Sequence, residues 1–108
     1  MHLNIFAELE ALPAPALLID LDGLIIFANT CAQRYLSVVD ITDMPVVAFV
    51  RDWRHRSGRS KLETRVSDVI VRSGESAPMQ IAVFEVGANG QNVTGLVLLR
   101  RAGGPSGR

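Results

Sequence analysis

The first residues of the chain show the hydrophobic pattern of a helix. Their apolar side chains recur at intervals of three and four, which places them on one helical face. They are Leu3, Ile5, Phe6, Leu9 and Leu12. Pro13 and Pro15 come next, and proline does not continue a helix. Residues 1–12 are therefore predicted to form a short amphipathic helix.

Two short apolar runs follow the prolines and predict a hairpin. Residues 16–19 and 24–28 are rich in leucine and isoleucine, as expected of buried strands. They are separated by Asp20-Leu21-Asp22-Gly23, a combination that favours a tight turn. These residues are expected to form two antiparallel strands with a turn at Gly23.

Two helices are predicted between this hairpin and the later strands. Asn29 or Thr30 can cap the first, which places Cys31, Tyr35 and Leu36 on one face. Asp43 can cap the second, ahead of Pro45 in its first turn. That helix is expected to run to about His55 and to present an apolar stripe to the core. The stripe consists of Val46, Phe49, Val50 and Trp53.

The second half of the chain predicts three more strands. Residues 64–72, 78–86 and 93–99 are rich in β-branched and aliphatic side chains. The turns between them, at 73–76 and 87–90, contain glycine. Short connections favour an antiparallel meander, and the first hairpin is expected to join it beside the last strand. The predicted fold class is α+β, with one five-stranded antiparallel sheet and helices on one face.

Both faces of the late strands are apolar, so both need a cover. Met79, Ile81 and Val83 alternate with Ala82, Phe84 and Val86, and Leu96 and Leu98 alternate with Val97 and Leu99. The two middle helices can cover one face only. We therefore expect the N-terminal helix, from the same chain or a second copy, to cover the other and to mediate a homodimer. The predicted interface residues are Phe6, Leu9, Leu12, Phe84 and Leu98.

Composition and charge narrow the class of protein. A chain of 108 residues, 48% hydrophobic and 20% charged, is expected to form one globular domain. Eleven basic and eleven acidic side chains balance, which gives no reason to expect a nucleic-acid partner. No apolar run approaches the roughly 20 residues of a membrane helix, and the start does not resemble a signal peptide, so a cytoplasmic location is expected. The basic residues between Arg51 and Arg65 are interpreted as solvent-exposed, and residues 102–108 as a flexible tail.

The sequence indicates no catalytic or metal centre. Cys31 is the only cysteine and is interpreted as a small, buried hydrophobic residue, while His2 and His55 show no triad or metal spacing. The segment LLIDLDG resembles the nucleophile motif of haloacid-dehalogenase-type phosphatases, with Asp20 as nucleophile and Asp22 as acid and base. Those enzymes need a parallel α/β core and further carboxylates, so a phosphatase fragment stays a remote alternative.

The ordered set of motifs resembles the PAS domain family. The resemblance is carried by LPAPALLIDLDGLIIFANTCAQRYL, by VIVRSGESAPMQIAVFEV and by NVTGLVLLRR. Asp20, Gly23 and Asn29 match the family's strand, turn and helix pattern, and Gly74 matches its later turn, although Ser73 replaces the usual acid. The resemblance implies a PAS domain at residues 13–101, preceded by the amphipathic helix.

The resemblance also implies a function. PAS domains are sensory and interaction modules that regulate a histidine kinase, a cyclase or a transcription regulator, for example in two-component systems; the module itself is not expected to be an enzyme. A ligand would lie between the sheet and the helices, where the pocket candidates are Phe27, Tyr35, Phe49, Trp53, Ile81 and Val97. The alternative is a stand-alone dimerisation adaptor without a ligand.

No cofactor is indicated. The Asn-Cys-Arg motif of flavin photosensors is missing, and Cys31 lies on the earlier helix. His55 is the only candidate for a haem ligand, but continuing the predicted helix turns it away from the core stripe. The sequence therefore predicts that His55 can be replaced without consequence.

Overall fold

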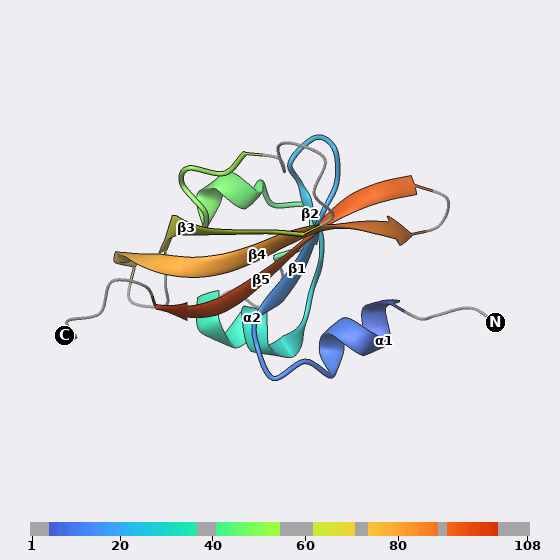
Figure 1. The fold of residues 1–108 in the computed structure, drawn as a ribbon, viewed down its shortest axis with the longest axis horizontal. Coiled ribbons are helices and arrows are strands. Elements are labelled where there is room, and N and C mark those ends of the chain that lie inside the picture. The colour runs from blue at the N-terminus through green and yellow to red at the C-terminus, as the bar shows by residue number, and fades with distance from the viewer. Residues whose placement is uncertain (1–4, 37–40, 55–61, 71–73, 89–90, 102–108) are drawn as a thin grey trace.

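The computed structural model describes residues 5–36, 41–54, 62–70, 74–88 and 91–101. Its elements are, in chain order, α1 (Ile5–Glu10), β1 (Ala16–Ile19), β2 (Ile25–Ala28), α2 (Thr30–Leu36), the short 3₁₀ helix η1 (Val46–Ala48), β3 (Leu62–Ile70), β4 (Ser76–Ala88) and β5 (Gln91–Arg101). Figure 1 shows the strands twisting across the middle of the molecule, with the helices packed around them.

The five strands form one antiparallel sheet in the order β2-β1-β5-β4-β3. β1 lies between β2 and β5, so Leu17 pairs with Ala28 on one side and with Leu96 on the other. The predicted α+β class, the antiparallel sheet and the position of the first hairpin beside the last strand are confirmed. β4 and β5 are longer than predicted because the ladder between them reaches Ala88 and Gln91, next to the predicted Asn-Gly turn, whereas β3 begins and ends two residues before the predicted range.

The turn of the first hairpin is built by Asp20 and Gly23. One carboxylate oxygen of Asp20 accepts hydrogen bonds from the N–H groups of Asp22 and Leu24, both at 2.9 Å. Gly23 has a φ of +83°, a conformation that a β-carbon hinders. Gly74, at φ +88°, meets the same requirement before β4. The motif residues therefore have the local structural roles that turn chemistry assigns to them.

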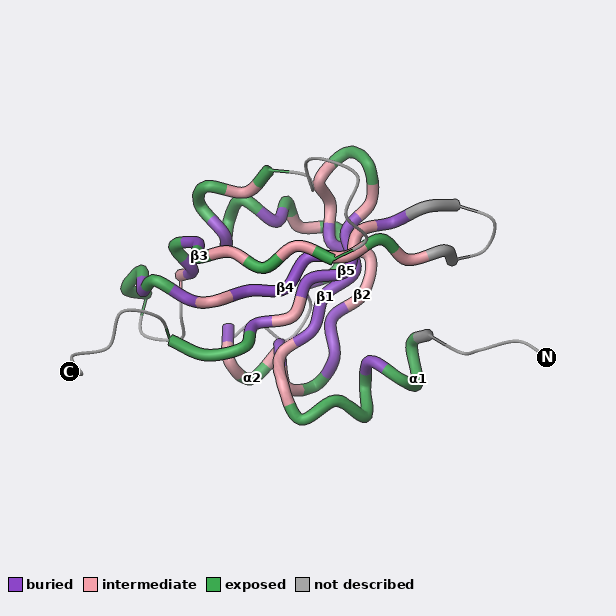
Figure 2. Tube along the Cα trace, in the orientation of Figure 1, coloured by how far each residue is buried: buried purple, intermediate pink, exposed green. Residues whose placement is uncertain are grey.

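The sheet has two covered faces with different apolar clusters. The face against which α2 and η1 pack is called the inner face here, and the face that carries α1 is called the outer face. The inner cluster contains Leu17, Ile19, Ile25, Ala28, Ala32, Leu36, Ile41, Val46, Phe49, Val50, Val69, Met79, Ile81, Val83, Leu96 and Leu98. The outer cluster contains Leu9, Ala16, Leu18 and Val93, with Ile26, Phe27, Val86 and Val97 packed against it. Figure 2 shows the central strands as the most buried part of the chain.

The alternation predicted for β4, and that of Leu96 and Leu98 against Val97 in β5, are confirmed, but the predicted interface included one β5 residue from the inner face. Met79, Ile81 and Val83 belong to the inner cluster, and Val86 packs with the outer one. Leu98 was predicted to share an interface with Phe84, and this prediction is wrong. Leu98 pairs with Ile81 and is buried in the inner cluster, because the two-residue period keeps it on the same face as Leu96.

The second predicted helix is wrong in length and in its cap. Within residues 41–54, η1 is the only helical element, with Pro45 at its N-cap, and Asp43 adopts a φ of +71°. Beyond η1 the backbone turns to β3, where Val50 bridges to Val69. Sheet hydrogen bonds thus replace the continuing helix. His55 lies outside the described residues, so the helical argument for its orientation has no basis.

Candidate functional site

The apolar stripe of α1 anchors this helix to the outer face. Leu9 is buried and packs in the cluster formed with Ala16, Leu18 and Val93. The Phe6 ring meets the Phe27 ring of β2 at a centroid distance of 5.1 Å and an angle of 49°. The predicted cover of the outer face by the N-terminal helix is therefore present within a single chain. Leu3 and the side chain of Ile5, also part of the predicted stripe, lie outside the described residues.

Asn29 links α1 to the sheet and to α2. Its side chain is fully buried and makes four hydrogen bonds. Its oxygen accepts from the N–H groups of Ala16 at 3.0 Å and Ala32 at 2.8 Å, and its Nδ2 donates to the carbonyls of Leu9 at 2.8 Å and Ala14 at 2.9 Å. The bond to Ala32 is the predicted helix cap, in which the side chain accepts from N3. The bonds to Leu9 and Ala14 were not foreseen, because they depend on how α1 docks.

Glu10 adds a second link between α1 and α2. Both of its carboxylate oxygens lie 3.2 Å from the N–H of Thr30, which begins α2. A carboxylate at this end of a helix is favoured because the first N–H groups have no partner within the helix. Nothing in the sequence around Glu10 indicates that its carboxylate meets the N–H of Thr30, so this contact could not be predicted.

The outer face beyond α1 carries a tightly fitted aromatic ring. Phe84 pairs with Gly95 across the β4–β5 ladder, and a β-carbon at position 95 would come within 3.0 Å of the Phe84 ring. Glycine is thus required there by close approach, not by its backbone angle. Two apolar side chains in and just after α1 remain in contact with solvent, Phe6 and Leu12, each 38% exposed. Figure 2 shows that most of α1 is exposed around one buried position.

The inner face is where a small ligand was expected, and two pocket candidates do not lie there. Phe27 and Val97 pack against the outer cluster, so they cannot line one pocket with the others. Tyr35, Phe49, Trp53 and Ile81 do belong to the inner side. The strands alternate, and a bulge at Leu18/Ile19 shifts the register of β2, which the pattern alone does not reveal.

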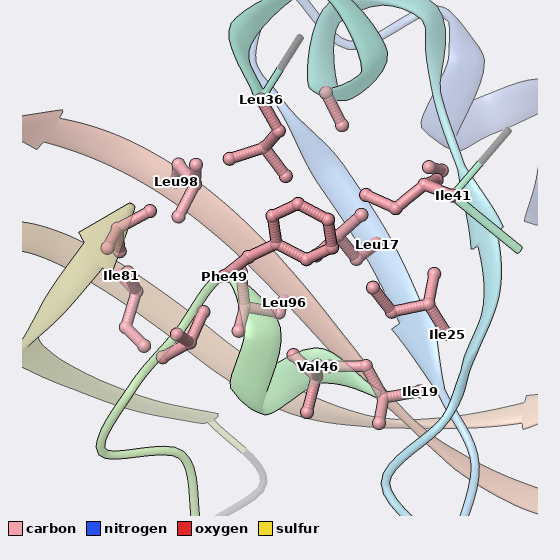
Figure 3. Packing of buried hydrophobic residues seen from close by; sticks show 14 of the residues in the cluster. Leu17, Ile19, Ile25, Leu36, Ile41, Val46, Phe49, Ile81, Leu96 and Leu98 are labelled. Atoms are coloured by element: carbon pink, nitrogen blue, oxygen red, sulfur yellow. The ribbon is translucent and has the colours of Figure 1, made fainter. Parts of the chain in front are cut away.

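Phe49 fills the middle of this inner region. Its ring points between the sheet residues Leu17 and Leu96 and Leu36 of α2 (Figure 3). Close by, the Tyr35 hydroxyl donates to the sulfur of Met79 at 3.4 Å. The middle of the space between the sheet and the helices is therefore occupied by the Phe49 ring.

A charged cluster lies at the rim of the inner face. The Arg65 guanidinium is 5.4 Å from the centre of the Trp53 ring, and it donates to Glu63 at 3.1 Å and to the Arg54 carbonyl at 2.6 Å. Only 9% of the Arg65 side chain is exposed. The interpretation of Arg65 as a solvated charge is therefore wrong. The alternation of β3 could have shown this, since Arg65 shares a face with the buried Ser67 and Val69.

The described residues show little that would support a metal site, a membrane helix or a phosphatase centre. They include no cluster of metal-ligating side chains, and no described helix is long and apolar enough to cross a membrane. Asp20 uses its carboxylate in the turn, and the antiparallel sheet differs from the parallel core that a haloacid-dehalogenase-type phosphatase needs. Cys31, interpreted as buried, is partly exposed.

No family model and no curated protein matches the sequence. Solved structures do match the fold. The PAS domain of nitrogen regulation protein NR(II) from Vibrio parahaemolyticus has a TM-score of 0.70 and 15% identity, over 92% of this chain and 99% of that one. The PAS domain of an HTR-like protein from Haloarcula marismortui has a TM-score of 0.70 and 12% identity, over 89% and 88%. A PAS domain from Desulfitobacterium hafniense has a TM-score of 0.68 and 13% identity, over 85% and 96%.

These likenesses define the class of fold. The strand order, the two helices and the positions of Asp20, Gly23 and Asn29 agree with the resemblance found in the sequence. The chain has a PAS-like fold. Function is a property of sites and not of folds, so it has to be argued from the two faces of the sheet.

Proposed function

We propose that this chain is a regulatory PAS module that acts through protein–protein contact and dimerises through α1 and the outer face. The observation that carries this proposal is the fixed position of α1, whose last turn is bonded to Asn29. The proposed contact surface is built from Phe6 of this anchored helix, whose ring meets Phe27 of β2, and from Leu12, which follows the helix; each is 38% exposed. Such a surface suits a second copy, since a two-fold axis brings the same patch together with itself.

The proteins that contain the matched PAS domains suggest what kind of output this module regulates. Three of the matched structures come from a nitrogen regulation protein, an HTR-like protein and Bordetella pertussis BvgS. These names support a place in a larger signalling protein, with residues 13–101 as the regulatory domain and a histidine kinase, a cyclase or a transcription regulator as output. A cytoplasmic location belongs to the same proposal.

The second candidate is a dimerisation adaptor that binds no ligand. One observation favours it over small-molecule sensing, namely that Phe49 fills the inner region between Leu17 and Leu36. A ligand of any size would have to displace this ring. In the adaptor, the contact surface and not an occupied pocket carries the regulation.

The test is sedimentation of the whole chain as wild type and as the double variant Phe6→Asp/Leu12→Asp. Both side chains are partly exposed, so the variant is expected to fold and to sediment as a monomer where the wild type is a dimer. Leu21→Asp is the matched control, because Leu21 is 75% exposed in the hairpin turn. A double variant that dimerises like wild type contradicts the proposed surface. Native mass spectrometry of the wild type separates the candidates, since a bound small molecule opposes the adaptor.

A further inference from the structure

β3 is an edge strand, and the backbone of the described chain covers only one end of its free edge. The N–H of Ile70 donates to the Phe49 carbonyl at 2.7 Å, and the Asp68 carbonyl accepts from the N–H of Arg51 at 3.1 Å. Backbone groups along a strand alternate in direction with a period of two residues. The same edge therefore continues at the even-numbered residues toward the start of the strand.

The remaining part of this edge, named the open edge here, consists of the backbone groups of Leu62, Thr64 and Val66. Within the part of the chain that the structure describes, no backbone hydrogen bond reaches it. The β3–β4 ladder is regular from Leu62 to Ile70, so no bulge turns the edge away. Natural edge strands usually carry charges, prolines or bulges that prevent pairing. The charged Glu63 and Arg65 of β3 lie on the inner face, and their side chains are only 18% and 9% exposed. The residues of the open edge, Leu62, Thr64 and Val66, are uncharged, and Leu62 and Val66 are 59% and 55% exposed.

The sequence of the open edge is self-complementary. In an antiparallel pairing of two copies centred on Thr64, Leu62 lies opposite Val66 of the second copy and Thr64 lies opposite Thr64. On the other side of the strand, Glu63 lies opposite Arg65 of the second copy. Apolar residues thus meet apolar residues, and opposite charges meet, which are the cross-strand pairs that stabilise a sheet.

Other registers fit less well. A pairing centred on Val66 needs the edge at Asp68 and Ile70, where Arg51 and Phe49 are already bonded. Within one chain, Glu63 already accepts from Arg65 at 3.1 Å and lies 3.9 Å from Arg54. The pairing centred on Thr64 extends this intrachain pair into an alternating array of charges across the two-fold axis.

We propose that the open edge pairs with the same edge of a second copy, so that one antiparallel sheet continues across two chains. The pairing covers Leu62 and Val66 with each other and forms its central hydrogen bonds between the two Thr64 residues. Five residues bury less than the roughly 1,200 Å² of a standard stable interface, so this contact is weak and depends on concentration. It does not depend on α1 or on the outer-face dimer.

The experiment follows backbone amides of the whole chain by NMR from micromolar to millimolar concentration. The N–H signals of Thr64 and Val66 are expected to shift with concentration and to exchange more slowly, because they become hydrogen bonded. An outer-face dimer without edge pairing would shift Phe6 and Leu12 and leave these amides unchanged. That result would overturn the edge proposal and leave the proposed function standing.

The decisive variant is Thr64→Pro. The Thr64 N–H points to the open edge, so proline removes both central donors of the pairing while the ladder with β4 loses none. Loss of two hydrogen bonds is expected to weaken the edge association by at least about tenfold. Thr64→Val keeps the N–H and is the matched control. If Thr64→Pro associates through the open edge as strongly as wild type, the proposal is overturned.

A second variant covers the case in which Thr64→Pro does not fold. Val66→Lys places a charge opposite Leu62 of the second copy at a position where the lone chain tolerates one, since Val66 is half exposed. We expect this variant to remain folded and to lose the concentration dependence at Thr64, whereas Val66→Thr retains it. If Val66→Lys associates through the edge like wild type, the pairing is refuted.

Discussion

The side-chain amide of Asn29 donates a hydrogen bond of 2.8 Å to the carbonyl oxygen of Leu9, twenty residues earlier in the chain. The side chain of the same Leu9 is buried against the outer face of the sheet. One residue of α1 is thus held twice, by its side chain in the outer cluster and by its backbone at the start of α2. This double attachment makes α1 part of the domain and not a loose extension.

Asn29→Ala is expected to destabilise the protein and to release α1. The variant leaves the Ala16 and Ala32 N–H groups and the Leu9 and Ala14 carbonyls without their buried partner. Losses of this kind cost about 1–3 kcal/mol, and the lost cap contributes to them. Urea denaturation followed by circular dichroism measures the change.

Two further variants, at Asn29 itself and at its neighbour Thr30, serve as controls for Asn29→Ala. Asn29→Asp keeps the acceptor for Ala16 and Ala32 but cannot donate to Leu9, so limited proteolysis is expected to cut near residue 12 faster in this variant than in wild type. Thr30→Ala alters an exposed neighbour and is expected to leave stability within about 0.5 kcal/mol of wild type. An Asn29→Ala variant as stable as Thr30→Ala would show that the four bonds contribute nothing net.

Gly95→Ala is expected to destabilise the β4–β5 ladder, because the new methyl group collides with the Phe84 ring. Overpacking typically costs about 1–3 kcal/mol. Thermal unfolding of Gly95→Ala, Phe84→Leu and Gly95→Ala/Phe84→Leu checks the cause, since in the double variant the smaller leucine should recover part of the loss. A double variant that is less stable by the full sum of the two single effects would contradict the ring contact.

The periodic elements of this fold could be predicted from sequence, and the contacts between them could not. Alternation placed Met79 and Val83 on one face correctly, because a strand has a fixed period of two. The stripe that begins at Val46 satisfied helical spacing equally well, yet hydrogen bonds of Phe49 and Arg51 to β3 replaced the helix. Tertiary pairing of this kind overrides local periodicity and leaves no local signal.

The site residues also fall into those that a local sequence pattern identifies and those whose position depends on tertiary contacts. Gly23 and Asn29 could be identified because a turn and a cap require particular side chains at fixed offsets. The faces of Phe27 and Val97 were not identified, since they depend on a bulge in the β1–β2 ladder and on the register with neighbouring strands. Glu10 was missed because its partner, Thr30, is close to it only after α1 has docked.

Phe49→Ala is expected to convert the filled inner region into a cavity that binds small apolar molecules. The ring is 6% exposed and is surrounded by Leu17, Leu36 and Leu96, so its removal leaves a space lined by aliphatic side chains. Such a cavity stays dry and can accept a ligand such as benzene. Removing a buried phenylalanine also costs about 3–5 kcal/mol of stability, which is measured in the same samples by urea denaturation.

The measurement compares thermal unfolding with and without benzene for wild type, Phe49→Ala and Val47→Ala. A ligand that binds only the folded state raises the unfolding temperature. Val47 lies two residues away and is 51% exposed, so its replacement opens no cavity and should behave like wild type. A rise for Phe49→Ala alone supports the view that the Phe49 ring occupies the place of a ligand. If benzene stabilises the wild type as much as the variant, the inner region already accepts small molecules, and the sensing role is favoured over the ligand-free adaptor.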